Sequence, residues 1–202
     1  YQDWMPATSI TYEFIENMQI RVAYSQTVNR PSLLEITGTT IRNPENFQLY
    51  RGNVFVQPAE LESWDARWEW YFGAGDSMSL GVFYKEFDDP IEQAQIQAQN
   101  LIYTWFNAEE AELEGIEYDF RKELLLADWF DIDSEGWNDP VWNNFVLSAN
   151  ISYIDSNVVL LGEGETAADV PITGGRQIGR LFQNERPLTG QSDWLGNVLL
   201  AY

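Results

Sequence analysis

The chain has 202 residues, a formal net charge of −21, and neither cysteine nor histidine. Without these residues it has no disulfide, no thiolate metal site, no Ser-His-Asp triad and no histidine ligand for zinc. The acidity repels phosphate and so argues against nucleic acid as a partner. Carboxylate catalysis and calcium binding stay compatible with this composition, although the separation of paired carboxylates is not readable from sequence.

Apolar and polar residues alternate with a period of two, which predicts β-strands. Seven such segments of about nine to thirteen residues suit tilted membrane crossings better than the shorter strands of soluble proteins. No stretch reaches the ~18 apolar residues of a membrane-spanning helix. In chain order, the apolar positions are Ile10, Tyr12 and Phe14; Met18, Ile20, Val22 and Tyr24; Trp64, Ala66, Trp68, Trp70 and Phe72; Met78, Leu80, Val82 and Tyr84; Ile116, Tyr118 and Phe120; Phe145, Leu147, Ala149, Ile151 and Tyr153; Trp194, Val198, Leu200 and Tyr202.

The connections between these segments alternate in length. Tight turns are expected at residues 16–17 and 73–77, and long loops at 29–59, 88–106 and 156–186. Short turns at one end and long loops at the other are typical of an outer-membrane β-barrel. Residues 124–144 break this rule, because a short turn is expected there, and a short helical piece is predicted around 124–129.

Each predicted strand has an apolar, aromatic-rich face and a polar face. Tyrosine and tryptophan lie toward the strand ends, where a membrane girdle would be, and the polar face carries mid-strand charges such as Arg21, Arg67 and Glu117. A soluble β-sandwich would show the same alternation, which leaves a carbohydrate-binding module as the alternative. Strand length and loop asymmetry favour the barrel. Since single-chain barrels have even strand numbers, seven strands are expected to be part of a larger one.

Five motifs in order resemble the barrel of TonB-dependent receptors. They are VAYSQTVNRP (22–31), GNVFVQPAELESWDARWEWYF (52–72), SLGVFYKEFDDPIEQ (79–93), FNAEEAELEGIEYDFRKEL (106–124), and the pair FVLSANISYIDS (145–156) and RPLTGQSDWLGNVLLAY (186–202). The chain departs from the family pattern GNP at Val54, and in the long 124–144 connection.

The resemblance implies an all-β, antiparallel up-and-down barrel of about 22 strands, closed by a plug domain and energised through TonB. Residues 1–202 would be the later-middle part of it, with the plug and the final strands outside this chain. The implied function is import of a scarce ligand (siderophore, cobalamin or glycan) across the outer membrane, not catalysis, with no cofactor. The implied partners are outer-membrane lipid and lipopolysaccharide, the rest of the barrel, the plug, and TonB through the plug.

Two acidic groups are candidate cation sites. Asp131, Asp133, Glu135 and Asp139 resemble the start of a calcium loop, but Trp142 stands where an EF-hand needs its bidentate glutamate. A second group near the predicted outer rim would bind divalent cations that bridge lipopolysaccharide, or would be a hydrated surface. Its members are Asp88, Asp89, Glu92, Glu109, Glu110, Glu112 and Glu114.

The long loop at 29–59 holds the residues best suited to a ligand. Arg42 and Arg51 would suit an anionic iron chelate, whereas Tyr50 and Phe55 would suit a glycan; loop scaffolding is the plainer role for all four. Gly174-Gly175-Arg176 precedes no helical pattern and is not expected to bind phosphate. No catalytic, cofactor-binding or metal-binding residue is therefore predicted, and no substrate contact is assigned.

Overall fold

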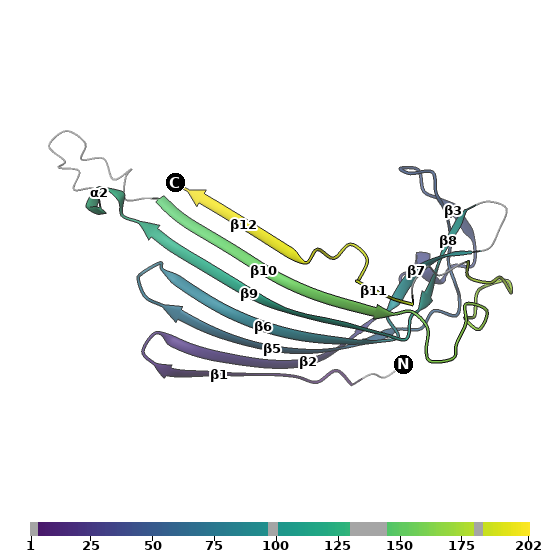
Figure 1. The fold of residues 1–202 in the computed structure, drawn as a ribbon, viewed down its shortest axis with the longest axis horizontal. Helices are drawn as coiled ribbons and strands as arrows, with labels where there is room; N and C mark the ends of the chain where they lie inside the picture. Colours follow the sequence, from purple (N-terminus) through teal and green to yellow (C-terminus); the bar gives the residue numbers. More distant parts are fainter. Residues whose placement is uncertain (1–3, 97–100, 130–144, 180–183) are drawn as a thin grey trace.

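The structure, a computed structural model, describes residues 4–96, 101–129, 145–179 and 184–202. Its main feature is one curved antiparallel sheet whose long strands run between tight turns at one end and long loops at the other (Figure 1). The strands, in order across the sheet, are β1 (Ala7–Ile15), β2 (Met18–Asn29), β5 (Ala59–Tyr71), β6 (Ser77–Asp88), β9 (Glu110–Leu124) and β10 (Phe145–Val159); the last position is shared by β11 (Glu185–Arg186) and β12 (Trp194–Ala201). All seven predicted long strands are confirmed.

The register places the predicted apolar residues on one face of this sheet. A single row across the strands reads Tyr12, Ile20, Trp68, Leu80, Tyr118 and Ile151. These side chains are not packed under a second layer, since Leu80 and Ile151 keep 47% and 48% of their surface exposed. A β-sandwich would bury this face against another sheet, so the described residues do not support that alternative.

Local side-chain chemistry explains the tight turns. Asn17 has a positive φ of 63°, which asparagine tolerates well, and its backbone N–H donates to Glu13 Oε1 at 3.0 Å. In the β5–β6 turn, Asp76 accepts a hydrogen bond from the Glu123 backbone N–H at 2.7 Å and an ion-paired one from Lys122 Nζ at 2.5 Å. One carboxylate thus ties the β5–β6 turn to β9.

The Asp76 contact predicts a pH-dependent contribution to stability. The hydrogen bond from Lys122, and then that from the Glu123 N–H, hold the pKa of Asp76 below its ordinary value of 3.8. A lowered folded-state pKa stabilises the fold above the ordinary pKa, and this stabilisation is lost as the pH falls through the folded-state pKa. The urea midpoint of the full-length protein should therefore exceed that of Asp76→Asn at neutral pH, and the difference should shrink below about pH 4. A difference that persisted undiminished in stronger acid would contradict this assignment.

The long loops at 29–59 and 88–106 form a second sheet, which sequence periodicity does not predict. It contains β3 (Thr40–Arg42), β4 (Leu49–Arg51), β8 (Ile102–Asn107) and β7 (Ile91–Ile96), in that order. The β4–β8 pair is parallel and aligns Tyr50 with Tyr103, so strands from two different loops are joined. A short helix, α1 (Leu33–Ile36), precedes β3. We call this the loop sheet.

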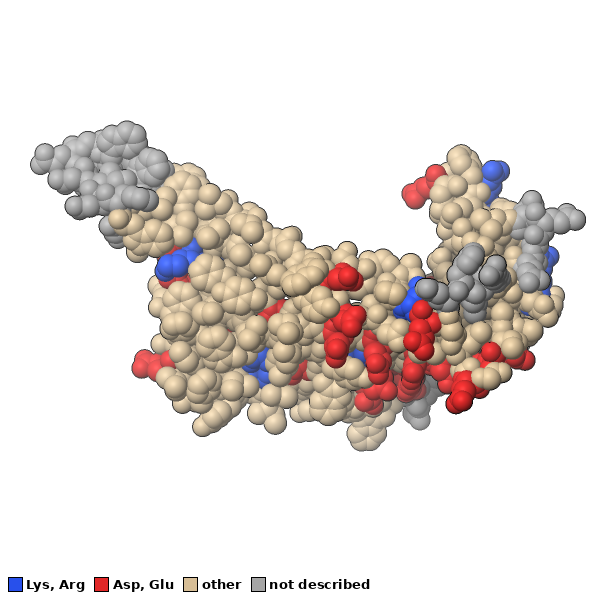
Figure 2. Space-filling view, viewed as in Figure 1, with Lys and Arg blue, Asp and Glu red and all other residues tan. Residues whose placement is uncertain are grey.

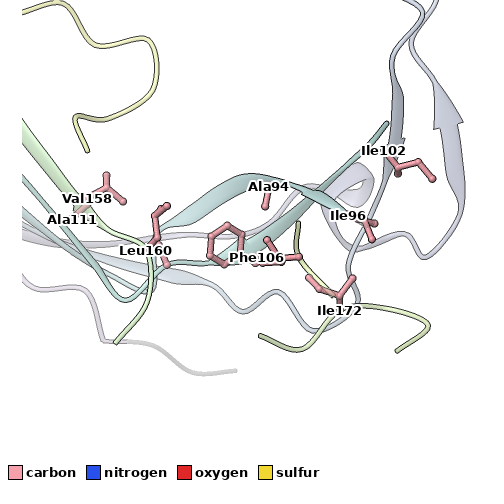
Figure 3. Packing of buried hydrophobic residues seen from close by; sticks show 10 residues of the cluster. Ala94, Ile96, Ile102, Phe106, Ala111, Val158, Leu160 and Ile172 are labelled. Atoms are coloured by element: carbon pink, nitrogen blue, oxygen red, sulfur yellow. The ribbon is translucent and has the colours of Figure 1, made fainter. Parts of the chain in front are cut away.

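We call the large curved sheet, whose apolar face no second layer covers, the membrane sheet. The buried apolar residues lie chiefly in the loops rather than in this sheet. One face of the loop sheet packs against the third long loop, 156–186, and against the ends of β9 and β10 (Figure 3). We call this cluster the loop core; its buried members are Ala94, Ile96, Ile102, Phe106, Ala108, Ala111, Val158, Leu160, Ile172 and Ile178. Burial of these ten apolar side chains is a strong stabilising contribution, so the three loops form one packed body.

The irregular connection after β9 begins as the sequence predicts. Helix α2 (Leu126–Trp129) follows the strand and confirms the predicted short helical piece. The calcium-like pattern at residues 131–139 lies outside the described residues. In the described part of the chain, no helix is both long and apolar enough to cross a bilayer.

Candidate functional site

The polar face of the membrane sheet carries a network of paired charges. Arg67 Nη2 lies 2.9 Å from Glu117 Oε2, and Arg67 Nη1 lies 3.3 Å from Asp119 Oδ2. Asp119 also accepts hydrogen bonds from Ser79 Oγ at 3.1 Å and from Asn150 Nδ2 at 2.6 Å. Arg67, Asp119 and their neighbours Ser79 and Asn150 line a hollow of about 440 Å³ formed by β5, β6, β9, β10 and β12. A ladder of paired charges across the strands is stable beside water but costly beside lipid. This face of the membrane sheet is therefore the one that lines the lumen.

A second group extends the same ladder toward β2. Arg21 Nη2 lies 3.6 Å from Glu69 Oε2, Tyr71 Oη donates to Glu69 at 3.0 Å, and Gln19 also bonds to Glu69. Every mid-strand charge in these pairs was assigned to the polar face by its position in the sequence. The alternation of apolar and polar residues alone does not predict which of these charges form ion pairs with each other.

The opposite face changes character near the loop end of the strands. Tyr24 and Trp64 are in contact, with ring centroids 4.3 Å apart, and Tyr84 Oη donates to Glu112 at 2.9 Å. Beyond these aromatics the same face becomes acidic, in rows pairing Glu62 with Glu86 and then Glu112. Figure 2 shows acidic side chains gathered toward the loop end of the molecule. Aromatics followed by charges mark the passage from hydrocarbon to headgroups.

The predicted rim group is only partly brought together. Asp88 pairs with Glu110 across β6 and β9, and Glu112 and Glu114 follow on the same face. Glu92 instead is buried and pairs with Arg186 at 2.5 Å. Burial, with Asp88 nearby, raises the pKa of Asp89. Among the residues that the structure describes, no three carboxylates are placed to hold a metal ion.

Asn53 joins three loops in the interior of the loop body. It is 1% exposed, and its Nδ2 donates to the backbone oxygens of Trp105 at 3.0 Å and Pro171 at 2.9 Å. Its Oδ1 accepts from the backbone N–H and the hydroxyl of Thr173, both at 3.1 Å. The neighbouring Gly52 is equally constrained, since a Cβ there would overlap the Thr37 carbonyl oxygen.

Asn107 plays a similar part at the base of the loop sheet. Its Nδ2 donates to the carbonyl oxygens of Gln57 at 3.0 Å and Asp89 at 2.7 Å, and its Oδ1 accepts from the Gln57 N–H at 2.8 Å. Asp89 has a positive φ of 54° at this point. Asn53 and Asn107 fall in the motifs GNVF and FNAE, which was the only sequence signal that pointed to either of them.

Aromatic side chains cover the face of the loop sheet that points away from the loop core. The ring of Tyr50 stacks on Tyr103 and on Trp105, with centroid distances of 5.6 Å for both pairs. Tyr50 and Trp105 line an open pocket of about 500 Å³, together with Arg42 and Gln93. Pockets of ~300–1,000 Å³ with aromatic walls and a few polar groups are the usual form of small-molecule sites.

The structure separates the four residues of the long 29–59 loop that were weighed as ligand contacts and not assigned. Arg42 and Tyr50 share the pocket, whereas Arg51 lies close to the Gly174 backbone and Phe55 is half-exposed in the connection to β5. Gly174 and Gly175 both have positive φ values, 83° and 64°, in a turn after which the described residues up to 179 form no helix. The sequence did not single out Tyr103, Trp105 or Gln93.

The sequence pattern of the family described as TonB dependent receptor-like, beta-barrel, matches residues 1–202. The chain belongs to this family. Comparison with curated proteins gives no match. TonB-dependent receptors are outer-membrane β-barrels, receptors and transporters rather than enzymes, which agrees with the apolar outer face and the charged lumen face.

Solved structures with a similar fold include two receptors of Pseudomonas aeruginosa. The siderophore receptor PirA is 16% identical, with a TM-score of 0.56, over 77% of this chain and 30% of PirA. The ferric enterobactin receptor PfeA, in a mutant form bound to enterobactin, is 14% identical, with a TM-score of 0.51, over 77% of this chain and 25% of PfeA. At this identity the likeness concerns the fold. The chain spans less than a third of either receptor.

Proposed function

We propose that this TonB-dependent receptor chain is one section of the wall of an active importer. The remaining strands, a plug inside the barrel, and TonB acting through the plug would complete the transporter. The observation that carries the proposal is that the two faces of the membrane sheet differ in chemistry. One face has aromatic and aliphatic residues in register, and the other has the Arg67, Glu117 and Asp119 ladder. A water-filled or plugged lumen accepts such a ladder.

The second part of the proposal is that ligand capture takes place in the loop body. Its three loops are fixed to each other by the loop core and by Asn53, so they present a formed surface at the external end of the barrel. Lipid and lipopolysaccharide would surround the outer face, with the acidic rows at headgroup level. Siderophores, cobalamin and glycans are the ligand classes to be tested.

The transport proposal is tested in cells that produce the full-length receptor. Spent growth medium is compared by mass spectrometry for wild-type cells, cells lacking the receptor, cells lacking TonB, and complemented cells. We expect at least one compound to be depleted by wild-type and complemented cells only. Unchanged depletion of every compound in cells without the receptor would contradict an import role.

A further inference from the structure

The floor of the loop-sheet pocket is a rigid aromatic surface. Trp105 is 6% exposed and fixed in β8, and Tyr50 in β4 stacks on it with an interplanar angle of 27°. The Tyr50 hydroxyl donates to Gln48 Oε1 at 2.7 Å, which orients the ring. The faces of aromatic rings are electron-rich, so they attract slightly positive C–H groups on a flat ligand. A pyranose ring presents such a face.

The rim of the pocket is a turn with planar polar groups. Asn43 Oδ1 accepts from the Glu45 N–H at 2.8 Å, and the Phe47 N–H donates to the Asn43 carbonyl oxygen at 2.9 Å. The Arg42 guanidinium lies 5.1 Å from the Phe47 ring centroid. Amide, guanidinium and carboxylate groups can each make paired hydrogen bonds to adjacent hydroxyls. The turn is preformed, which lowers the entropic cost of binding.

The charge of the pocket disfavours an anionic ligand. Among the lining residues Arg42 is the one cation and Glu45 the one anion, so their formal charges cancel. The whole chain carries −21, and acidic rows lie on the strands below the loops. A ferric chelate with several negative charges would gain no net attraction here and would be repelled at longer range. A neutral, hydroxyl-rich ligand meets no such penalty.

We propose that this pocket binds a neutral saccharide, with one sugar ring lying on Tyr50 and its hydroxyls bonded to Asn43, Glu45 and Gln93. This rests on the proposed transport function and names the substrate class of its loop body. The similar folds of the siderophore receptors do not bear on it, because at 14–16% identity the likeness concerns the fold alone.

The test uses the purified full-length receptor in detergent. Binding is measured by calorimetry for a panel of neutral oligosaccharides (maltohexaose, cellohexaose, laminarihexaose, xylohexaose and mannohexaose) and for ferric enterobactin as the anionic probe. At least one oligosaccharide should bind, with an affinity that salt changes little. Tyr50→Ala should weaken that binding about tenfold or more, as truncation of a central aromatic contact does. Gln93→Ala, an exposed rim change that leaves packing intact, should weaken it several-fold.

Two control variants separate loss of the ring from loss of the fold. Tyr50→Phe keeps the ring and should retain most of the affinity, and Phe55→Ala removes an aromatic residue outside the pocket and should change nothing. The saccharide proposal is overturned if no oligosaccharide binds, or if Tyr50→Ala and Gln93→Ala leave the affinity unchanged. It is also overturned if ferric enterobactin binds in a Tyr50-dependent way. In that last case TonB-dependent depletion from medium would persist, so the import role would stand while the saccharide assignment fell.

Discussion

Ile151→Arg is expected to lower the free energy of unfolding of the membrane-inserted receptor by about 2–4 kcal/mol, the cost of an arginine facing lipid in the middle of the apolar band. Ile151 lies in β10 between Ala149 and Tyr153 on the apolar face, and it pairs with Tyr118 of β9. The side chain is half-exposed because no protein layer covers it. Urea unfolding of the full-length receptor in phospholipid vesicles, followed by circular dichroism, measures the change.

The neighbouring position supplies the matched control. Asn150 lies on the lumen face, where its Nδ2 donates to Asp119 Oδ1 at 2.6 Å. Asn150→Arg replaces one donor to that carboxylate with another in a water-accessible place, so we expect a change of about 1 kcal/mol or less. Equal losses from the two substitutions would show that residues 150 and 151 do not face different solvents, and the barrel assignment of this sheet would fail.

Asn53→Ala is expected to open the loop body while leaving the membrane sheet intact. The substitution removes the donor to Trp105 and Pro171 and the acceptor for Thr173, all in the interior. Leaving buried polar groups without partners costs about 1–3 kcal/mol each, so a local loss of about 2–4 kcal/mol is expected after relaxation. Hydrogen–deuterium exchange should speed up in peptides covering residues 101–107 and 170–174.

Val54→Ala is the control for this loss. Val54 is 54% exposed, and the bond it makes to Thr173 Oγ1 comes from its backbone N–H, which alanine keeps. Exchange in the same peptides should match that of the unchanged receptor. If Asn53→Ala also leaves exchange unchanged, the three loops are held together by the loop core alone.

The membrane sheet was predictable because each of its faces meets a different solvent. Lipid on one side and water on the other force every strand to alternate, and this also fixes register, since Leu80 must lie beside Trp68 rather than Arg67. Family resemblance added the motif order and the transport role. The two tight turns were visible because asparagine tolerates the positive φ that Asn17 adopts, and because Gly73, Gly75 and Asp76 are residue types that turns favour.

There are physical reasons why the sequence did not predict the loop sheet. Strands β3 and β4 have three residues each, too few to show any period. In β8 both faces are covered, with Phe106 in the loop core and Trp105 under Tyr50, so apolar residues do not alternate with polar ones. The parallel pairing of β4 with β8 joins segments about fifty residues apart, and no local pattern encodes such a pairing.

The parallel joint between β4 and β8 restricts how such receptors can diverge or be re-engineered. A chimera that receives only one loop from a relative would bring half of the joint without its partner strand, and Asn53 would face carbonyl groups at the wrong positions. The ligand specificity of the loops should therefore transfer between receptors only when all three loops, residues 30–58, 89–109 and 160–186, are grafted together. Single-loop grafts should insert into the membrane normally and yet fail to display an ordered outer surface.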